Sequence, residues 1–176
     1  MILLNKYRVV EKLGEGGMGS VWLVHHLGLD EPRALKVISA RIAGDSRVRA
    51  RFEREARILA KLKHPGAVVV HDTGIVGDTA YIEMECVEGE SLRSFLRRVN
   101  RPPLPFVLRL MRGICDVLGV AHNRGIVHRD LKPENVMIQG DVQSGRCEVK
   151  VLDFGIAKIV QSGDSAEGSQ TMNTEG

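Results

Sequence analysis

The chain has 176 residues, of which 43% are hydrophobic and 27% charged, and this is enough apolar content for a globular core. Its formal net charge is only +3 and its basic residues are interspersed with acidic ones, which excludes a basic stripe for nucleic acid. The three cysteines form no CxxC pair that would indicate a zinc site or a disulfide framework, and no apolar run approaches the roughly 18 residues that span a bilayer.

The first half of the chain has the pattern of a β-rich unit with one helix. Short β-type runs alternate with glycine-containing and proline-containing turns, and one longer stretch has helical periodicity. The predicted strands cover residues 7–13, 20–24, 33–38, 67–71 and 79–86. Asp45 or Ser46 can cap a helix that runs to about Lys63, before His64 and Pro65.

After Gly89 the pattern becomes helical. We expect one helix over residues 91–100 and a longer, strongly apolar helix over residues 106–123. The apolar stripe of the second helix is so wide that more than one side must be buried, and the rest of the chain offers too little to cover it. A hairpin over residues 136–138 and 148–152 follows, and the polar stretch from Gln161 onward is predicted to be disordered.

A glycine-rich segment lies between the first two predicted strands. Gly14, Gly16 and Gly19 fit the pattern GxGxxGxV, with Val21 in the last position. Glycines allow backbone amides to approach phosphate oxygens closely. A dinucleotide-binding turn would need a helix directly after the glycines, whereas a strand follows here. The remaining alternatives are a phosphate-binding hairpin and an ordinary glycine-rich hairpin.

Lys36 is the next candidate, because it falls within the apolar strand segment ALKVI. An unpaired ammonium group is costly to bury, so Lys36 needs an anionic partner. Glu55 lies in the same helical stripe as Phe52 and Leu59, where a carboxylate is most simply explained by a cation opposite. The alternative is that Glu55 is a surface acid and Lys36 a lysine at a strand edge.

Two longer motifs follow in the second half of the chain. Residues 128–135 read HRDLKPEN, and residues 153–155 read DFG at the end of an alternating apolar run. An aspartate at a strand end is by itself often only a turn cap. With the glycines, Lys36 and Glu55 upstream in the right order, however, the whole set resembles the protein kinase family. The segments GEGGMGSVWLV and HRDLKPENVMI resemble those of bacterial serine/threonine kinases that are similar to eukaryotic ones.

The resemblance implies an α+β fold of the protein kinase type. Residues 1–85 would form the complete small lobe, with five strands and one helix, and residues 86–160 part of the helical large lobe. Residues 161–176 would be a truncated activation loop, because the chain ends before the family's APE motif. In that fold the long apolar helix packs on a helix that would lie beyond residue 176.

The resemblance also implies ATP and Mg²⁺ as the bound cofactors and assigns catalytic roles. Asp130 would orient or accept the proton of the attacking hydroxyl, and Lys132 would neutralise the transferring phosphoryl group. Asn135 and Asp153 would bind magnesium. Lysine at position 132, followed by Pro133, is typical of the serine/threonine branch of the family.

The nucleotide site implied by the resemblance begins with Lys36, which would hold the α and β phosphates and be positioned by Glu55. The other nucleotide-contacting positions come from the glycine-rich segment, the adenine-sandwiching side chains and the segment that joins the lobes. They are Leu13, Gly14, Glu15, Gly16, Gly17, Met18, Gly19, Val21, Ala34, Glu85, Val87 and Met137.

The function implied is transfer of the ATP γ-phosphoryl group to serine or threonine hydroxyls of a protein substrate. The alternative is a catalytically impaired fragment that binds nucleotide or acts as an interaction module. The partners expected are therefore ATP and a protein substrate, with no nucleic acid, and with self-association through exposed apolar surface. The expected compartment is the cytoplasm, and a membrane anchor in a longer parent protein is left open.

Overall fold

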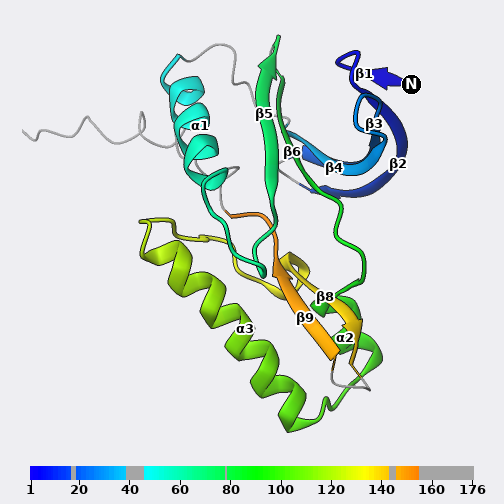
Figure 1. Cartoon of the computed structure of the whole chain (residues 1–176), viewed down its shortest axis with the longest axis vertical. Helices are drawn as coiled ribbons and strands as arrows, with labels where there is room; N and C mark the ends of the chain where they lie inside the picture. The colour runs from blue at the N-terminus through cyan, green and yellow to red at the C-terminus, as the bar shows by residue number, and fades with distance from the viewer. Residues whose placement is uncertain (17–18, 39–45, 78, 143–145, 155–176) are drawn as a thin grey trace, which may run out of the picture.

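The structure is a computed structural model that describes residues 1–16, 19–38, 46–77, 79–142 and 146–154. It contains a six-stranded sheet, here the first sheet, and a three-stranded sheet, here the second sheet. Figure 1 shows α1 beside the first sheet and α3 beside the second. The predicted α+β fold class is confirmed.

The first sheet is built almost entirely from consecutive antiparallel strands. Its members are β1 (Ile2–Leu3), β2 (Tyr7–Gly16), β3 (Gly19–His26), β4 (Glu31–Ile38), β5 (Val70–Val76) and β6 (Thr79–Glu85). The spatial order is β1-β2-β3-β4-β6-β5. The pairing of β2 with β3 contains two register shifts, and such irregularities bend a strand. The sheet accordingly curls in Figure 1.

The helices and the second sheet complete the described chain. They are α1 (Ser46–Leu59), β7 (Glu90–Ser91), α2 (Leu92–Arg98), α3 (Leu104–His122), the 3-10 helix η1 (Pro133–Asn135), β8 (Val136–Asp141) and β9 (Arg146–Val151). Ser91 caps α2, because its side chain accepts a hydrogen bond from the backbone N–H of Ser94. Asp45, one of the two predicted caps of α1, lies outside the described residues.

In the first half of the chain, the structure differs from the predicted elements in three main respects. The short strand β1 adds a sixth member to the predicted five strands of the first sheet. The helix predicted to reach Lys63 ends at Leu59, because Lys61 and Leu62 donate to carbonyls three residues back and tighten the last turn. The strand predicted over residues 67–71 is found at Val70–Val76, since Val68 hydrogen-bonds to Val151 in β9 instead.

One apolar core connects the two sheets. Buried side chains from α1, the first sheet, α3 and the second sheet belong to the same cluster, for example Phe52, Ile82, Phe106 and Val151. Burial of each such side chain contributes about 1.5–3 kcal/mol. The two sheets are therefore packed as one body, and this packing fixes the position of the residues between them.

Helix α3 is buried on one face only. Phe106, Leu110, Ile114, Val117 and Ala121 are buried at helical spacing. A methyl group at Gly113 would lie 2.6 Å from Val149, so this glycine allows α3 to approach β9 closely. Within the described residues, no helix combines the length and apolar content needed to cross a bilayer.

Candidate functional site

A pocket of about 460 Å³ lies between the first and second sheets. Its walls come from the glycine-rich end of β2, from β3, β4 and β6, from the segment between β6 and Ser91 in β7, and from η1, β8 and the two residues after β9. The lining residues are Leu13, Gly14, Val21, Ala34, Met84, Glu85, Cys86, Val87, Gly89, Ser91, Glu134, Asn135, Met137, Leu152 and Asp153. A pocket of this size with mainly apolar walls and a few polar groups is typical of a small-molecule site.

Most of the predicted nucleotide-contacting residues meet in this pocket. Seven of them line it, namely Leu13, Gly14, Val21, Ala34, Glu85, Val87 and Met137, together with both predicted magnesium ligands. The pairing of Val21 with Lys36, and of Ala34 with Met84, explains how three strands contribute to one wall. Glu15, Gly16, Gly19 and Lys36 are not among the lining residues, and Gly17 and Met18 lie outside the described residues.

The lining includes polar residues that were not predicted. Ser91 is the cap of α2, and Glu134 lies inside the HRDLKPEN motif next to Asn135. Each is a polar residue close in sequence to a predicted site residue, and this closeness is the signal from which either could have been predicted. Both add hydrogen-bonding groups to the pocket lining.

Gly19 determines how closely the start of β3 approaches β4. Its φ of +131° is rarely adopted by other residues, and a methyl group there would lie 2.0 Å from the backbone oxygen of Val37. The start of β3 can therefore lie against β4 only because residue 19 has no side chain. Gly14 and Gly16 differ from Gly19 in this respect, because a methyl group at either position would meet no atom within 4 Å.

Lys36 is paired with Asp153 and not with Glu55. The Lys36 Nζ lies 2.7 Å from Asp153 Oδ2, and the two side chains are 12% and 29% exposed. Although both side chains are described, no ion pair joins Lys36 to Glu55, which is half-buried on α1. The need of Lys36 for an anionic partner was correctly predicted, but its partner here is the carboxylate at the end of β9.

Asp130, Lys132 and Asn135 form a hydrogen-bonded group. Lys132 Nζ donates to Asp130 Oδ2 at 2.9 Å, and this bond raises the pKa of Lys132. Asn135 Nδ2 donates to the Asp130 backbone oxygen at 2.8 Å and lies 3.4 Å from Asp130 Oδ2. Asn135 is in turn tied to the end of β9, because Leu152 N donates to its backbone oxygen. The loop and the strand leading to Asp153 are thus linked.

The buried side chain of His128 connects the loop that carries Asp130 to Leu152, which follows β9. Its ring is buried, and Nε2 lies 2.7 Å from the backbone oxygen of Leu152 while Nδ1 accepts from Asp130 N. These contacts require the neutral ring with the proton on Nε2. Burial lowers the pKa of His128, which favours that neutral form. The ring also packs on Phe154, at 4.8 Å between centroids.

Two site residues have left-handed backbone conformations. Arg129 has a φ of 63° and Asp153 a φ of 54°, a region that costs energy for residues other than glycine. Such conformations persist only where surrounding contacts impose them, and they concentrate at functional sites. Here they occur directly beside Asp130 and at the end of β9.

The residues present fit a magnesium ion bound together with phosphates. Mg²⁺ prefers oxygen ligands and is usually held by one or two protein groups, with phosphate oxygens and waters completing its shell. Asp153 supplies a carboxylate, and Asn135 retains its amide oxygen because Nδ2 makes the bonds to Asp130. Within the described residues there is no cluster of three or more His, Cys, Asp or Glu side chains for a metal held by protein alone.

Comparison with known proteins identifies the family. The model of the protein kinase domain matches residues 7–175. The chain belongs to the protein kinase family. Serine/threonine-protein kinase pkn3 of Myxococcus xanthus is 44% identical to this kinase-family chain over 163 residues, which cover 90% of the chain and 29% of that protein. PknA of Mycobacterium tuberculosis is 38% identical over 177 residues, covering 98% of the chain and 40% of PknA.

Solved structures give the same result. The crystal structure of the PknI kinase domain of M. tuberculosis matches with a TM-score of 0.74 and 35% identity, covering 88% of this chain and 60% of that one. The kinase-family chain thus spans 29% and 40% of the two curated relatives and less than two thirds of this solved domain. The fold and the family are shared over nearly all of the chain.

Proposed function

We propose that this chain carries the nucleotide site and catalytic loop of a serine/threonine protein kinase. The observation that carries the proposal is the pocket of about 460 Å³ between the sheets. It brings the glycine-rich strand, the segment after β6, Asn135 and Asp153 together, beside the hydrogen-bonded pair of Asp130 and Lys132. The reaction would transfer the γ-phosphoryl group of ATP to a serine or threonine hydroxyl of a protein substrate.

In this reaction the bond between the γ-phosphorus and the bridging oxygen to the β-phosphate breaks, and a bond from the acceptor hydroxyl oxygen to the γ-phosphorus forms. Asp130 would orient the hydroxyl and take its proton, and Lys132 would balance charge on the transferring group. Lys36 would leave its present partner Asp153 for the α and β phosphates. Val21, Ala34 and Met137 would enclose the adenine ring.

Magnesium would be held by Asp153 and Asn135, where it neutralises phosphate charge. The ion pair of Lys36 with Asp153 is the contact that must open for this. A cation and a nucleotide phosphate would then replace the two halves of that pair. Without nucleotide, Lys36 and Asp153 neutralise each other, and with nucleotide each would pair with a group of the bound ligand instead.

The second candidate function is a nucleotide-binding or interaction module with little phosphotransfer. It is favoured by one observation, namely that Glu55 is not engaged with Lys36 while Lys36 is engaged with Asp153. A kinase and a nucleotide-binding module both require nucleotide binding and differ in turnover, whereas an interaction module requires neither.

Binding of ATP to this chain tests what a kinase and a nucleotide-binding module share. We expect ATP with Mg²⁺ at about 100 times its Kd to stabilise the chain by about 2.7 kcal/mol, which corresponds to a rise in Tm of roughly 5–10 °C. Lys36→Met removes the cation for the phosphates and should abolish most of this rise. Lys61→Met, at an exposed lysine after α1, should leave the rise unchanged. Thermal melting with and without Mg²⁺ measures each case.

No nucleotide-dependent rise in the wild-type chain would contradict the proposal. An equal rise in Lys36→Met would contradict the role assigned to that lysine. A rise that is the same in EDTA would contradict the assignment of magnesium to Asp153 and Asn135.

We further propose that the isolated chain associates with itself through the exposed face of α3, formed by Leu104, Leu108 and Met111. These residues are 67%, 61% and 50% exposed and repeat at helical spacing opposite the buried face. Light scattering coupled to size exclusion should show oligomers at tens of micromolar protein, and Leu108→Glu should shift them toward the monomer. The control Arg124→Glu changes charge at an exposed position outside this face. A monodisperse wild-type monomer would contradict this proposal.

The proposed compartment is the cytoplasm. It is supported by Cys86, Cys115 and Cys147, which are all free thiols in the structure. A bacterial setting is consistent with the relatives, which come from Myxococcus xanthus and Mycobacterium species.

A further inference from the structure

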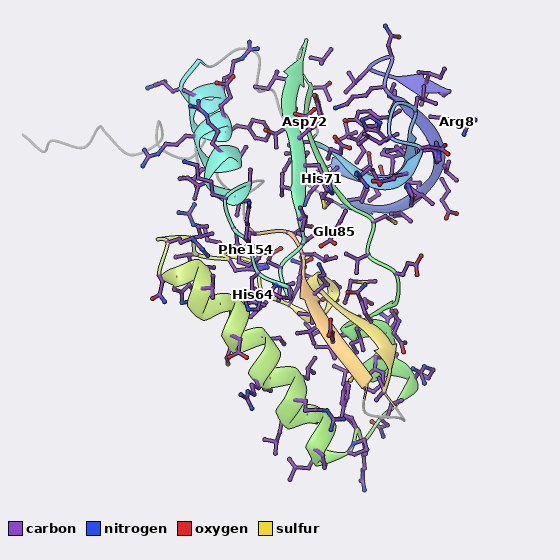
Figure 2. The ribbon with its side chains drawn as sticks, in the orientation of Figure 1. Arg8, His64, His71, Asp72, Glu85 and Phe154 are labelled. Atoms are coloured by element: carbon purple, nitrogen blue, oxygen red, sulfur yellow. The ribbon has the colours of Figure 1, made fainter. Side chains whose placement is uncertain are left out.

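One largely buried ion pair joins the first sheet to the second. Lys150 in β9 donates from Nζ to Oε1 of Glu85, at the end of β6, over 2.5 Å. The two side chains are only 14% and 26% exposed. Figure 2 shows Glu85 between the first sheet and the β8–β9 hairpin. Because the pair is shielded from water, its attraction is stronger than that of an exposed pair, and loss of one partner is more costly.

The same carboxylate also holds the chain that leads into β5. Val69 N donates to Glu85 Oε1 at 2.9 Å, and Glu85 N donates to Val69 O at 2.9 Å. Lys150 Nζ lies 3.4 Å from the backbone oxygen of Ala67, to which it donates. One lysine and one glutamate therefore connect three segments that are far apart in the sequence.

Backbone hydrogen bonds reinforce this connection. Val151 N donates to Gly66 O at 2.7 Å, and Val68 N donates to Val151 O at 3.0 Å. Ala67 and Val151 form a parallel bridge. Residues 66–69, Glu85 and residues 150–151 thus form one hydrogen-bonded unit, here called the junction. Gly66 has no room for a side chain, since a methyl group would lie 2.6 Å from Val117.

The junction reaches the pocket from two sides. Glu85, Cys86 and Val87 line the pocket where the adenine would lie. On the other side, the chain runs from Lys150 in β9 to Leu152 and Asp153, which follow β9 and both line the pocket. The ion pair therefore sits between the segment that would hold the base and the residue that would hold the metal and phosphates.

We infer that Lys150 and Glu85 are positioning residues that fix the segment of residues 85–87 relative to Asp153 and thereby set nucleotide affinity. The part that concerns nucleotide rests on the proposed function, whereas the junction rests on the contacts alone. Without the Lys150 ammonium, the Glu85 carboxylate is left poorly solvated and turns toward water, which releases Val69 N. The two sheets are then joined there by backbone bonds only.

Four variants test this inference in the full 176-residue chain. Lys150→Met removes the charge, Lys150→Arg keeps it, Glu85→Gln removes the negative charge but keeps an acceptor for Val69 N, and the double variant combines the two neutral changes. The control Arg112→Met breaks an exposed pair with Asp116 on α3, where the side chains are 85% and 60% exposed. Hydrogen exchange of residues 66–69, 84–87 and 150–152 is measured together with the affinity for ATP and Mg²⁺.

We expect Lys150→Met to raise exchange about tenfold in all three segments and to weaken ATP binding about threefold to tenfold, a range expected for coupled neighbouring charges. Lys150→Arg should restore most of both. The double variant should be no weaker than the worse single variant, because both changes remove the same contact. Arg112→Met should match the wild type.

Unchanged exchange and affinity in Lys150→Met would overturn the inference, and so would single effects that simply add in the double variant. If the wild-type chain binds no nucleotide, the proposed function fails, and exchange in the nucleotide-free chain alone decides whether the junction exists. If Lys150→Met does not fold, the effects of Glu85→Gln on exchange and affinity test the inference instead, because this change only replaces one carboxylate oxygen with an NH₂ group.

Discussion

Replacing Asp153 with alanine is expected to reduce phosphotransfer by roughly 10³-fold or more, the scale of loss when a main electrostatic contact to the reacting phosphate is removed. Asp153 supplies the carboxylate of the proposed metal site, and two further carboxylates, those of Glu85 and Glu134, line the same pocket. It is also the partner of Lys36 at 2.7 Å. The variant should be assayed beside the wild-type chain, with ATP, Mg²⁺ and an added serine/threonine-containing protein.

The accompanying measurement separates chemistry from folding. Melting of Asp153→Ala should show a folded protein with a lowered Tm, because the change removes one part-buried ion pair but leaves intact the apolar core that joins the two sheets. Asp72→Ala is a matched control, since Asp72 also pairs with a lysine, Lys6, but lies away from the pocket lining. Retained turnover in Asp153→Ala would contradict the metal assignment.

The second large effect is expected for Gly19→Ala. The new methyl group would lie 2.0 Å from the backbone oxygen of Val37, and the φ of +131° is unfavourable for alanine. Because backbone and not a flexible side chain is in the way, the start of β3 must move from β4. We expect a loss of about 2–4 kcal/mol in the free energy of unfolding, measured by denaturant titration, and weaker ATP binding.

Gly119→Ala provides the control for this experiment. Gly119 lies within α3, and a methyl group there would meet no atom within 4 Å. Alanine is the better helix former by about 1 kcal/mol, so this variant should be as stable as the wild type or more stable. Equal stability of Gly19→Ala and the wild type would show that the backbone at residue 19 does not require glycine.

Local patterns in the sequence predicted the elements that depend on local physics. Helix α3 was expected over residues 106–123 and occupies Leu104–His122, because its apolar periodicity is strong. Strands around the glycine-rich segment were found in the predicted order, since alternation and turn residues specify an antiparallel meander. The long HRDLKPEN motif was informative because several of its residues contact one another, as Asp130, Lys132 and Asn135 do.

The contacts between distant segments could not be predicted in this way. Residues 67–69 have the composition of a strand, but Val68 N donates to Val151 O and Val69 N donates to the Glu85 carboxylate, and only the packed structure brings these partners near. The partner of Lys36 depends on how the two sheets are placed relative to each other. A periodicity argument identifies Glu55 as an acid on the correct helix face, but it cannot decide between that acid and Asp153.

The most direct test of the proposed function is phosphotransfer by the 176-residue chain itself. The chain is incubated with ATP and Mg²⁺ and its intact mass is measured, with Asp153→Ala as the control and melting in the same samples to verify folding. The account predicts addition of phosphate to the wild-type chain only. A folded wild-type chain that gains no phosphate and transfers none to an added serine/threonine-containing protein would contradict a complete catalytic site in this chain and favour the nucleotide-binding module.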